Sequence, residues 1–229
     1  QVPNANAVLK DLPGWSVFGT AGNADGFTGG TVHNSGFKGC IFTGPNEIVV
    51  AFKGTGGGKL FQDVLADAKI AVGVVPREAT AAHHLFERAR NAFGGQPLRP
   101  ITVVGHSLGG GLTQVIAHWH KVRFVSFNAP AMGSTIQKAK VNFFKPQQMV
   151  RAIQASSKAG AEGYNFRVQG DPVSSRKLSA LGHYGKVITI KTPLINGMTP
   201  LSAHSMTRFH DYLSRSSDGY KDPFIDRFV

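Results

Sequence analysis

The sequence predicts an α/β fold in which a mainly parallel sheet carries helices on both faces. Short runs rich in β-branched and aromatic residues alternate along the chain with segments of helical periodicity, and this alternation is typical of parallel sheets with helical crossovers. Several of the strand-like runs are apolar throughout, as expected of strands covered on both faces. With 229 residues, 41% of them hydrophobic, and no Pro/Ser-rich linker, we expect a single domain over residues 1–229.

The N-terminal part of the chain predicts little regular structure. Residues 1–36 are rich in Gly, Asn, Asp and Ser, so we expect an irregular wrap with at most a short helix near residues 5–12. Two strand-like runs follow, at 37–43 and 47–53, with the turn formers Gly44-Pro45-Asn46 between them. This pattern predicts a β-hairpin whose second strand lies inside the sheet.

The remaining elements follow from periodicity and from their end signals. Residues 78–93 form an amphipathic pattern that Gly94-Gly95 ends, which predicts a helix. The other predicted strands cover 101–104, 123–130, 164–168 and 186–190, and the other predicted helices cover the first half of 60–75, 112–119 and 203–213.

A glycine-flanked serine stands between a predicted strand and a predicted helix. The segment is Gly105-His106-Ser107-Leu108-Gly109, the G-x-S-x-G pattern of a nucleophile elbow. A Cβ at either glycine would collide with the neighbouring strand or helix in so tight a turn. We therefore expect Ser107 above the sheet edge, at a helix N-terminus where the amide of Leu108 can stabilise an oxyanion.

A nucleophilic serine needs a base, and the base needs an acid that orients it. Between Ser107 and His210 the only acids are Glu162 and Asp171. Asp171 follows a predicted strand and is framed by a glycine and a proline, which is where α/β sheets place functional groups. We therefore favour Asp171 over Glu162, which lies in a polar, Gly-rich loop.

Three histidines after Asp171 are candidate bases: His183, His204 and His210. His204 precedes or opens the last predicted helix, so its ring can turn toward the sheet edge, and we prefer it to the other two. The chain order Ser, Asp, His is that of the α/β-hydrolases, and we expect this fold.

Other site types find little support in the sequence. Lys59 is followed by Leu60 where a phosphate loop needs Ser or Thr, so we expect no nucleotide site. The three glycines at 56–58 instead predict a hinge, with residues 59–75 as the flap that it moves.

No metal or other cofactor is expected either. The neighbours His83 and His84 point to different faces of a helix, and His118 and His120 are likewise divided. Cys40 is the single cysteine, so no intramolecular disulfide forms, and we interpret it as a filler residue.

The chain is strongly basic, with 25 Lys and Arg against 13 Asp and Glu and a net charge of +12. Between positions 121 and 191 there are twelve basic and two acidic residues, a local balance of 12 − 2 = +10. No nucleic-acid-binding motif accompanies this charge, so an anionic membrane surface or an acidic partner is favoured over nucleic acid. A merely solvated basic face is the alternative.

Five blocks of sequence together resemble class 3 lipases, the fungal triacylglycerol-lipase-like α/β-hydrolases. The blocks are 49–55 (VVAFKGT), 105–110 (GHSLGG), 127–130 (FNAP), 168–173 (VQGDPV) and 204–206 (HSM). The resemblance implies a triad of Ser107, Asp171 and His204. It also implies an oxyanion hole made by Thr55 and the amide of Leu108.

The resulting expectation is a serine hydrolase that cleaves lipid esters through an acyl-enzyme. Alternatives are a non-catalytic lipid-binding or toxin-like module, and a soluble esterase or thioesterase. No run of eighteen apolar residues occurs and no basic-then-apolar pattern follows Gln1, so we expect neither a membrane span nor a signal peptide within the given sequence. We expect export with a removed signal, while a cytoplasmic location and the oligomeric state stay open.

Overall fold

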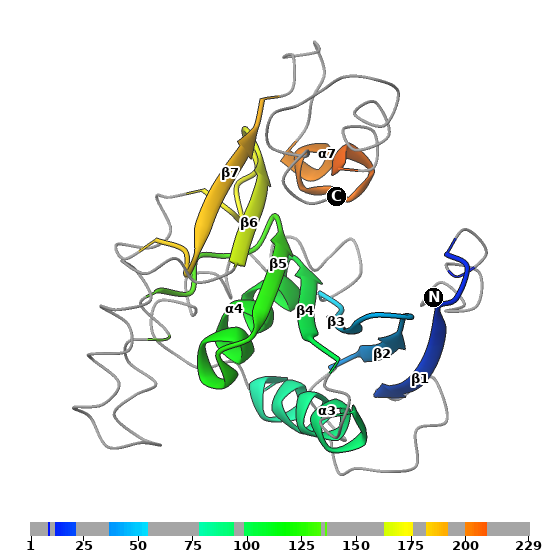
Figure 1. The fold of residues 1–229 in the computed structure, drawn as a ribbon. Coiled ribbons are helices and arrows are strands. Elements are labelled where there is room, and N and C mark those ends of the chain that lie inside the picture. Colours follow the sequence, from blue (N-terminus) through cyan, green and yellow to red (C-terminus); the bar gives the residue numbers. More distant parts are fainter. Residues whose placement is uncertain are drawn as a thin grey trace.

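A computed structural model describes residues 9, 12–21, 37–54, 78–93, 99–133, 136, 163–175, 182–191 and 200–209. Within these ranges the chain forms one seven-stranded sheet whose spatial order follows the chain order, β1 to β7 (Figure 1). The strands are β1 (Ser16–Ala21), β2 (Gly39–Thr43), β3 (Ile48–Phe52), β4 (Ile101–His106), β5 (Arg123–Phe127), β6 (Gly163–Val168) and β7 (Lys186–Ile190).

The sheet is mainly parallel, as predicted. β3, β4, β5, β6 and β7 pair in parallel, and β1 and β2 extend the β3 edge as antiparallel strands. The predicted hairpin is β2–β3, whose register pairs Thr43 with Ile48 across the turn. Because the parallel strands all end at the same edge, the segments that follow β4, β5 and β6 are brought together there.

The prediction of an irregular wrap over residues 1–36 is wrong for residues 16–21. These residues form β1, which pairs with β2 and carries a bulge between Val17 and Gly19. The bulge and Gly19 interrupt the alternation on which a strand prediction depends. The partner strand supplies the hydrogen bonds that define β1, and the local pattern does not reveal them.

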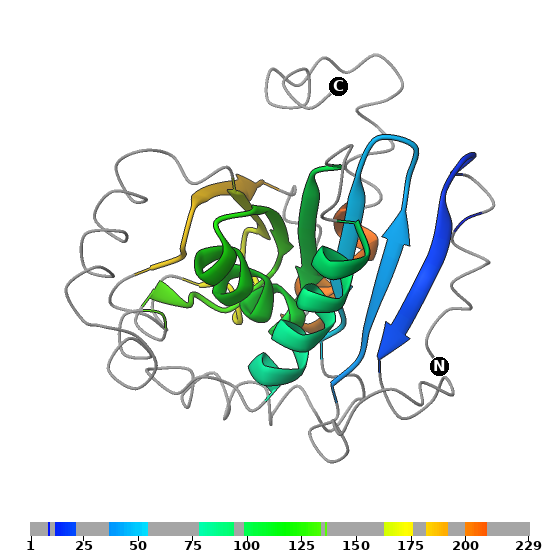
Figure 2. The same ribbon diagram turned by 60° about the horizontal axis from the view of Figure 1, so that its bottom comes forward.

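Helices cover both sides of the sheet. The structure describes α3 (Glu78–Phe93), α4 (Leu108–His120) and α7 (Pro200–His204). In Figure 2, α3 and α4 lie in front of the strands and α7 lies behind them. Helix α7 begins three residues before the predicted helix at 203–213 and ends at His204, and residues 207–209 are helical again after a break at 205–206. Pro200 opens it, since proline fits the first turn of a helix, and positions 210–213 lie outside the described residues.

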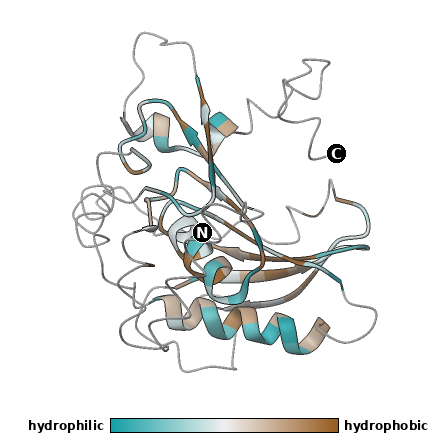
Figure 3. Cartoon of the chain, turned by 60° about the vertical axis from the view of Figure 1, so that its left-hand side comes forward, coloured by the Kyte–Doolittle hydropathy of each residue, from teal (hydrophilic) through white to brown (hydrophobic). Residues whose placement is uncertain are grey.

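Two apolar clusters hold these layers. The larger cluster joins α3 and α4 to β2, β3 and β4, and hydropathy alternates along α3, at the bottom of Figure 3, as in a helix with one buried face. In the smaller cluster, Ala203 and Phe209 pack against Val168 and Ile190. This second cluster fixes α7 against the ends of β6 and β7, and so fixes the place of His204.

The predicted helix within 60–75, the glycines 56–58 and the flap at 59–75 lie outside the described residues. Among the helices that the structure does describe, none has the length and apolar character that crossing a membrane requires.

Candidate active site

Ser107 occupies a sharp turn between β4 and α4. Its backbone has φ 57° and ψ −129°, a conformation that is uncommon for a residue with a side chain and typical of strained functional turns. Two backbone hydrogen bonds hold it: its N–H donates to the carbonyl of Phe127 at 3.0 Å, and its own carbonyl accepts from Gly111 at 3.1 Å.

The glycines of the turn are required for the reason that the sequence predicts. A Cβ on Gly105 would lie 2.4 Å from the backbone of Gly109, and a Cβ on Gly109 would lie 2.2 Å from the carbonyl oxygen of Phe52 in β3. Both contacts involve backbone atoms, which cannot move aside. The close packing of β3, β4 and α4 is what lifts Ser107 to the sheet edge.

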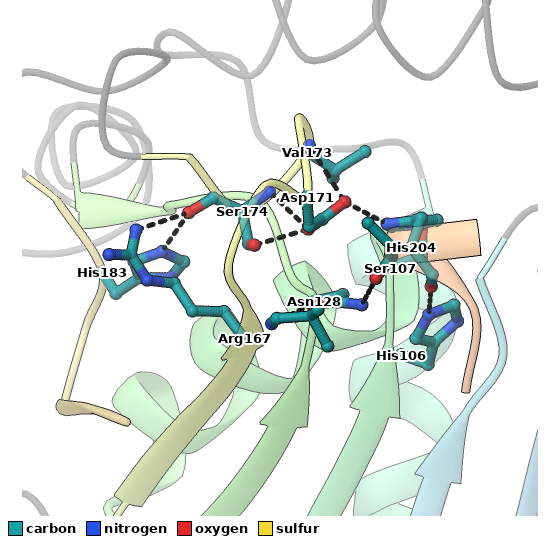
Figure 4. Close-up of polar contacts among 11 residues, drawn as sticks. His106, Ser107, Asn128, Arg167, Asp171, Val173, Ser174, His183 and His204 are labelled. Atoms are coloured by element: carbon teal, nitrogen blue, oxygen red, sulfur yellow. Dashed lines mark hydrogen bonds and ion pairs between the residues drawn. The ribbon is translucent and has the colours of Figure 1, made fainter. Parts of the chain in front are cut away.

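His204 lies between Ser107 and Asp171 (Figure 4). Its Nε2 is 2.8 Å from Ser107 Oγ, and its Nδ1 is 2.8 Å from Asp171 Oδ1. The three side chains are largely buried, with relative exposures of 4%, 9% and 2% for Ser107, His204 and Asp171. The structure therefore brings the three sequence-predicted residues together in a continuous hydrogen-bonded chain.

The carboxylate of Asp171 is held by the turn that follows it. Its Oδ1 accepts from the N–H of Val173 at 3.3 Å, and its Oδ2 accepts from the N–H of Ser174 at 2.9 Å and from the Ser174 hydroxyl. A buried carboxylate needs such donors in place of water. With these bonds the oxygen that faces His204 has a fixed direction.

The rival candidates take other places. His183 Nε2 lies 3.2 Å from the carbonyl oxygen of Ser174, and Figure 4 shows His183 and Arg167 converging on this oxygen, away from Ser107. His210 and Glu162 lie outside the described residues.

Asn128 is a site residue that the sequence reasoning missed. It follows β5 with φ 44° and is fully buried. Its Oδ1 accepts from the N–H of Val168, three residues before Asp171, and its Nδ2 donates to the carbonyl of Ala203, next to His204. In the sequence, Asn128 stands out only as part of the FNAP block. Asparagine is one of the few residues that readily adopt a positive φ, and this preference is the signal that could have identified the position.

His106, the residue before Ser107, was also missed. Its Nε2 donates to the backbone carbonyl of His204 at 2.7 Å, so the proton of a neutral ring stands on Nε2. Burial and the adjacent His204 lower the pKa of His106 to about 4. The ring is therefore neutral at neutral pH and adds no positive charge beside His204.

The residues predicted to form an oxyanion hole are only partly described. Leu108 begins α4, directly after Ser107, so its amide stands at the positive end of the helix. Thr55 lies outside the described residues. Its neighbour Gly54 passes against the elbow, where an added Cβ would lie 2.9 Å from Ser107 Cβ and 3.4 Å from the Leu108 nitrogen.

A solved lipase structure shares this fold at low sequence identity. The Rhizomucor miehei lipase propeptide complex aligns with TM-score 0.51 and 13% identity over 78% of this chain and 56% of that one. A lipase from Rhizopus microsporus var. chinensis aligns with TM-score 0.48 and 14% identity over 73% of this chain and 58% of that one. The chain thus spans little more than half the length of these lipases.

A search of curated protein sequences gives no match. The family profile of the Tle-like phospholipase domain, a phospholipase-like family, matches residues 10–206. This match runs from the segment before β1 through the elbow, the Asp171 turn and His204, and so takes in every element that builds the site. The chain therefore belongs to the family of Tle-like phospholipase domains.

Proposed function

We propose that this protein is a serine carboxylic-ester hydrolase that cleaves phospholipid esters through an acyl-enzyme. The observation that carries the proposal is the hydrogen-bonded series from Ser107 Oγ through the His204 ring to Asp171. Both contacts, Oγ to Nε2 and Nδ1 to Oδ1, measure 2.8 Å. A buried serine, histidine and aspartate in this order serve nucleophilic catalysis on many folds. Membership in a phospholipase-like family supports the choice of a lipid ester.

The proposed first half-reaction forms the acyl-enzyme. Ser107 Oγ attacks the ester carbonyl carbon while His204 Nε2 takes the hydroxyl proton, and the resulting imidazolium donates from Nδ1 to Asp171. Collapse of the tetrahedral intermediate breaks the bond to the leaving alcohol, which receives the proton from Nε2. A water molecule then repeats the sequence on the acyl-enzyme, releasing the fatty acid and restoring Ser107.

The negative charge on the intermediate needs donors that are already in place. We assign this role to the amide of Leu108, at the N-terminus of α4, and to Thr55. The close approach of Gly54 to Ser107 supports this assignment, because Thr55 is the next residue in the chain. One such donor contributes about 2.7–4 kcal/mol to transition-state stabilisation. The proposed steps use no metal ion or cofactor.

A fluorophosphonate probe tests the nucleophile. The full chain is incubated with the probe beside Ser107→Ala and the control Ser16→Ala, which removes an exposed hydroxyl on β1. We expect labelling of the wild type and of Ser16→Ala, and none of Ser107→Ala. Absence of labelling in folded wild-type protein overturns the proposal in favour of a non-catalytic lipid-binding module.

The substrate class needs a separate measurement. Turnover is compared on phosphatidylglycerol vesicles, a triacylglycerol emulsion, a soluble p-nitrophenyl ester and an acyl thioester. We expect the highest rate on the phospholipid, and Ser107→Ala removes all activity. A higher rate on the soluble ester or the thioester overturns the lipid assignment and leaves the serine mechanism intact.

A further inference from the structure

A second cluster of polar side chains lies between helices α3 and α4, outside the site described above. His83 and Glu87 are one helical turn apart on α3, and His120 is the last residue of α4. The sequence argues against metal binding only by histidine pairs within one helix. The fold creates a different pairing, across the two helices.

The potential ligand atoms converge. His83 Nδ1 lies 2.9 Å from His120 Nε2, and the other nitrogen of the same ring, His120 Nδ1, lies 3.4 Å from Glu87 Oε1. A single ion binds only one nitrogen of an imidazole ring, so these two short contacts cannot both become ligand pairs. One nitrogen or oxygen from each of the three residues lies within 4.8 Å of the others. Bonds of about 2.0 Å around a tetrahedral ion place neighbouring ligands about 3.3 Å apart. An ion bound by His83 Nδ1 and His120 Nε2 therefore requires the Glu87 carboxylate to leave His120 Nδ1 and move toward the ion.

Neighbouring side chains contact two of the three potential ligands. The His120 ring stacks on Phe86 with the centroids 4.2 Å apart, and the second oxygen of Glu87 pairs with Arg90.

We propose that His83, Glu87 and His120 bind one divalent transition-metal ion of the zinc type. Two imidazoles and one carboxylate form a donor set suited to such ions and poorly suited to calcium or magnesium. Among the residues that the structure describes, these three form the one group with this convergence. Three protein ligands leave a fourth position for water.

The ion has a structural role. His120 stands at the end of α4 that is opposite Ser107, about 20 Å away along a helix of 13 residues. At that distance the ion cannot touch an ester at Ser107. It joins the end of α4 to α3 instead, and α4 is the helix whose first turn forms the nucleophile elbow.

The competing arrangement is a hydrogen-bond chain without metal, in which His83 Nδ1 donates to His120 Nε2 and His120 Nδ1 donates to Glu87. These hydrogen bonds give the same nitrogen and oxygen atoms their partners. Under this arrangement the protein has no affinity for zinc, and its stability does not depend on zinc.

Zinc itself is the probe. The full chain is stripped with a chelator, the chelator is removed, and zinc is titrated while bound metal and the unfolding midpoint are measured. We expect one zinc per chain and a midpoint raised by roughly 5–10 °C when free zinc is a hundredfold above its dissociation constant. His83→Ala and Glu87→Gln each weaken binding by at least about tenfold, as loss of one ligand implies.

The control is His84→Ala, which removes an exposed histidine next to His83 on the same helix, and it keeps the wild-type affinity. Far-ultraviolet circular dichroism of the metal-free variants establishes that each is folded. The proposal is overturned if the wild type binds no zinc, or if His83→Ala and Glu87→Gln bind it as tightly as His84→Ala does.

Discussion

The side-chain amide of Asn128 donates a hydrogen bond to the backbone carbonyl of Ala203 at 2.9 Å. The oxygen of the same amide accepts from the N–H of Val168, also at 2.9 Å. One buried residue at the end of β5 therefore ties together the segments that carry His204 and Asp171. Both hydrogen bonds of the Asn128 side chain go to backbone atoms and not to the His204 ring or the Asp171 carboxylate, and so we assign it a positioning role.

We predict that Asn128→Gly lowers kcat by roughly 10- to 100-fold with little change in KM. Glycine keeps the positive φ without strain, so this variant isolates the two lost hydrogen bonds, each leaving a buried group unpaired at about 1–3 kcal/mol. Soluble-ester kinetics and the rate of fluorophosphonate labelling check the prediction. If stability falls but kcat per folded molecule does not, the role of Asn128 is purely structural.

The proposed triad predicts a large loss of turnover when any one of its members is replaced. Ser107→Ala and His204→Ala each lower turnover by about 10³-fold or more, and Asp171→Asn does so by a similar factor because it favours the wrong tautomer of His204. His183→Ala is the control, since the His183 ring hydrogen-bonds to the backbone carbonyl of Ser174 and not to the Ser107 hydroxyl. Near-normal activity in His204→Ala, with loss in His183→Ala or His210→Ala, would show that the base is misassigned.

Gly109→Ala tests the packing of the elbow. The new methyl group would stand 2.2 Å from the Phe52 carbonyl oxygen, and forcing it in costs about 1–3 kcal/mol or more of unfolding free energy. The control is Gly19→Ala, whose Cβ meets only the flexible end of Arg88 at 3.2 Å and changes stability by about 0.5 kcal/mol or less. Denaturant unfolding compares the two. Equal stabilities would contradict the close packing of α4 on β3.

Acid sensitivity follows from His106. Its pKa is about 4 in the folded protein and near 6.5 when unfolded. Between these values the unfolded chain binds a proton that the folded chain does not, so the free energy of unfolding falls as pH drops from about 6.5 to 4. His106→Gln keeps a donor for the His204 carbonyl and cannot titrate. We expect its unfolding midpoint to fall less from pH 7 to 4.5 than that of the wild type; parallel curves would contradict this.

Local features of the chain were predictable and contacts across the sheet were not. The strand, the glycine pair and the helix around Ser107 are all contiguous, so the geometry of the elbow follows from ten residues. The preference for Asp171 came from counting acids and from its place after a strand. The bonds of Asn128 and His106 to the His204 segment join residues 75 and 98 positions apart, and no local pattern encodes such pairs.

Strand β1 and the α3–α4 histidine pair illustrate the same limit. Residues 16–21 form a strand because they pair with the edge of β2. The sequence of an edge strand predicts such pairing only weakly. His83 and His120 meet because α3 and α4 pack side by side on one face of the sheet. The sequence of either helix alone does not predict this packing. The flap and Thr55 lie outside the described residues, and those expectations stay predictions.

The basic segment from 121 to 191 predicts how the protein reaches its substrate. This stretch carries a balance of +10 and includes Asp171, and each Lys or Arg near an anionic lipid surface contributes about 1 kcal/mol to adsorption. We predict that Ser107→Ala protein, which binds without hydrolysis, co-sediments more strongly with vesicles as phosphatidylglycerol content rises, and less strongly as salt rises and shortens the reach of the charges. Neutral phosphatidylcholine vesicles are the control. Equal binding to both vesicle types, unchanged between low and high salt, would rule out electrostatic adsorption and assign the basic segment to another partner or to solvation.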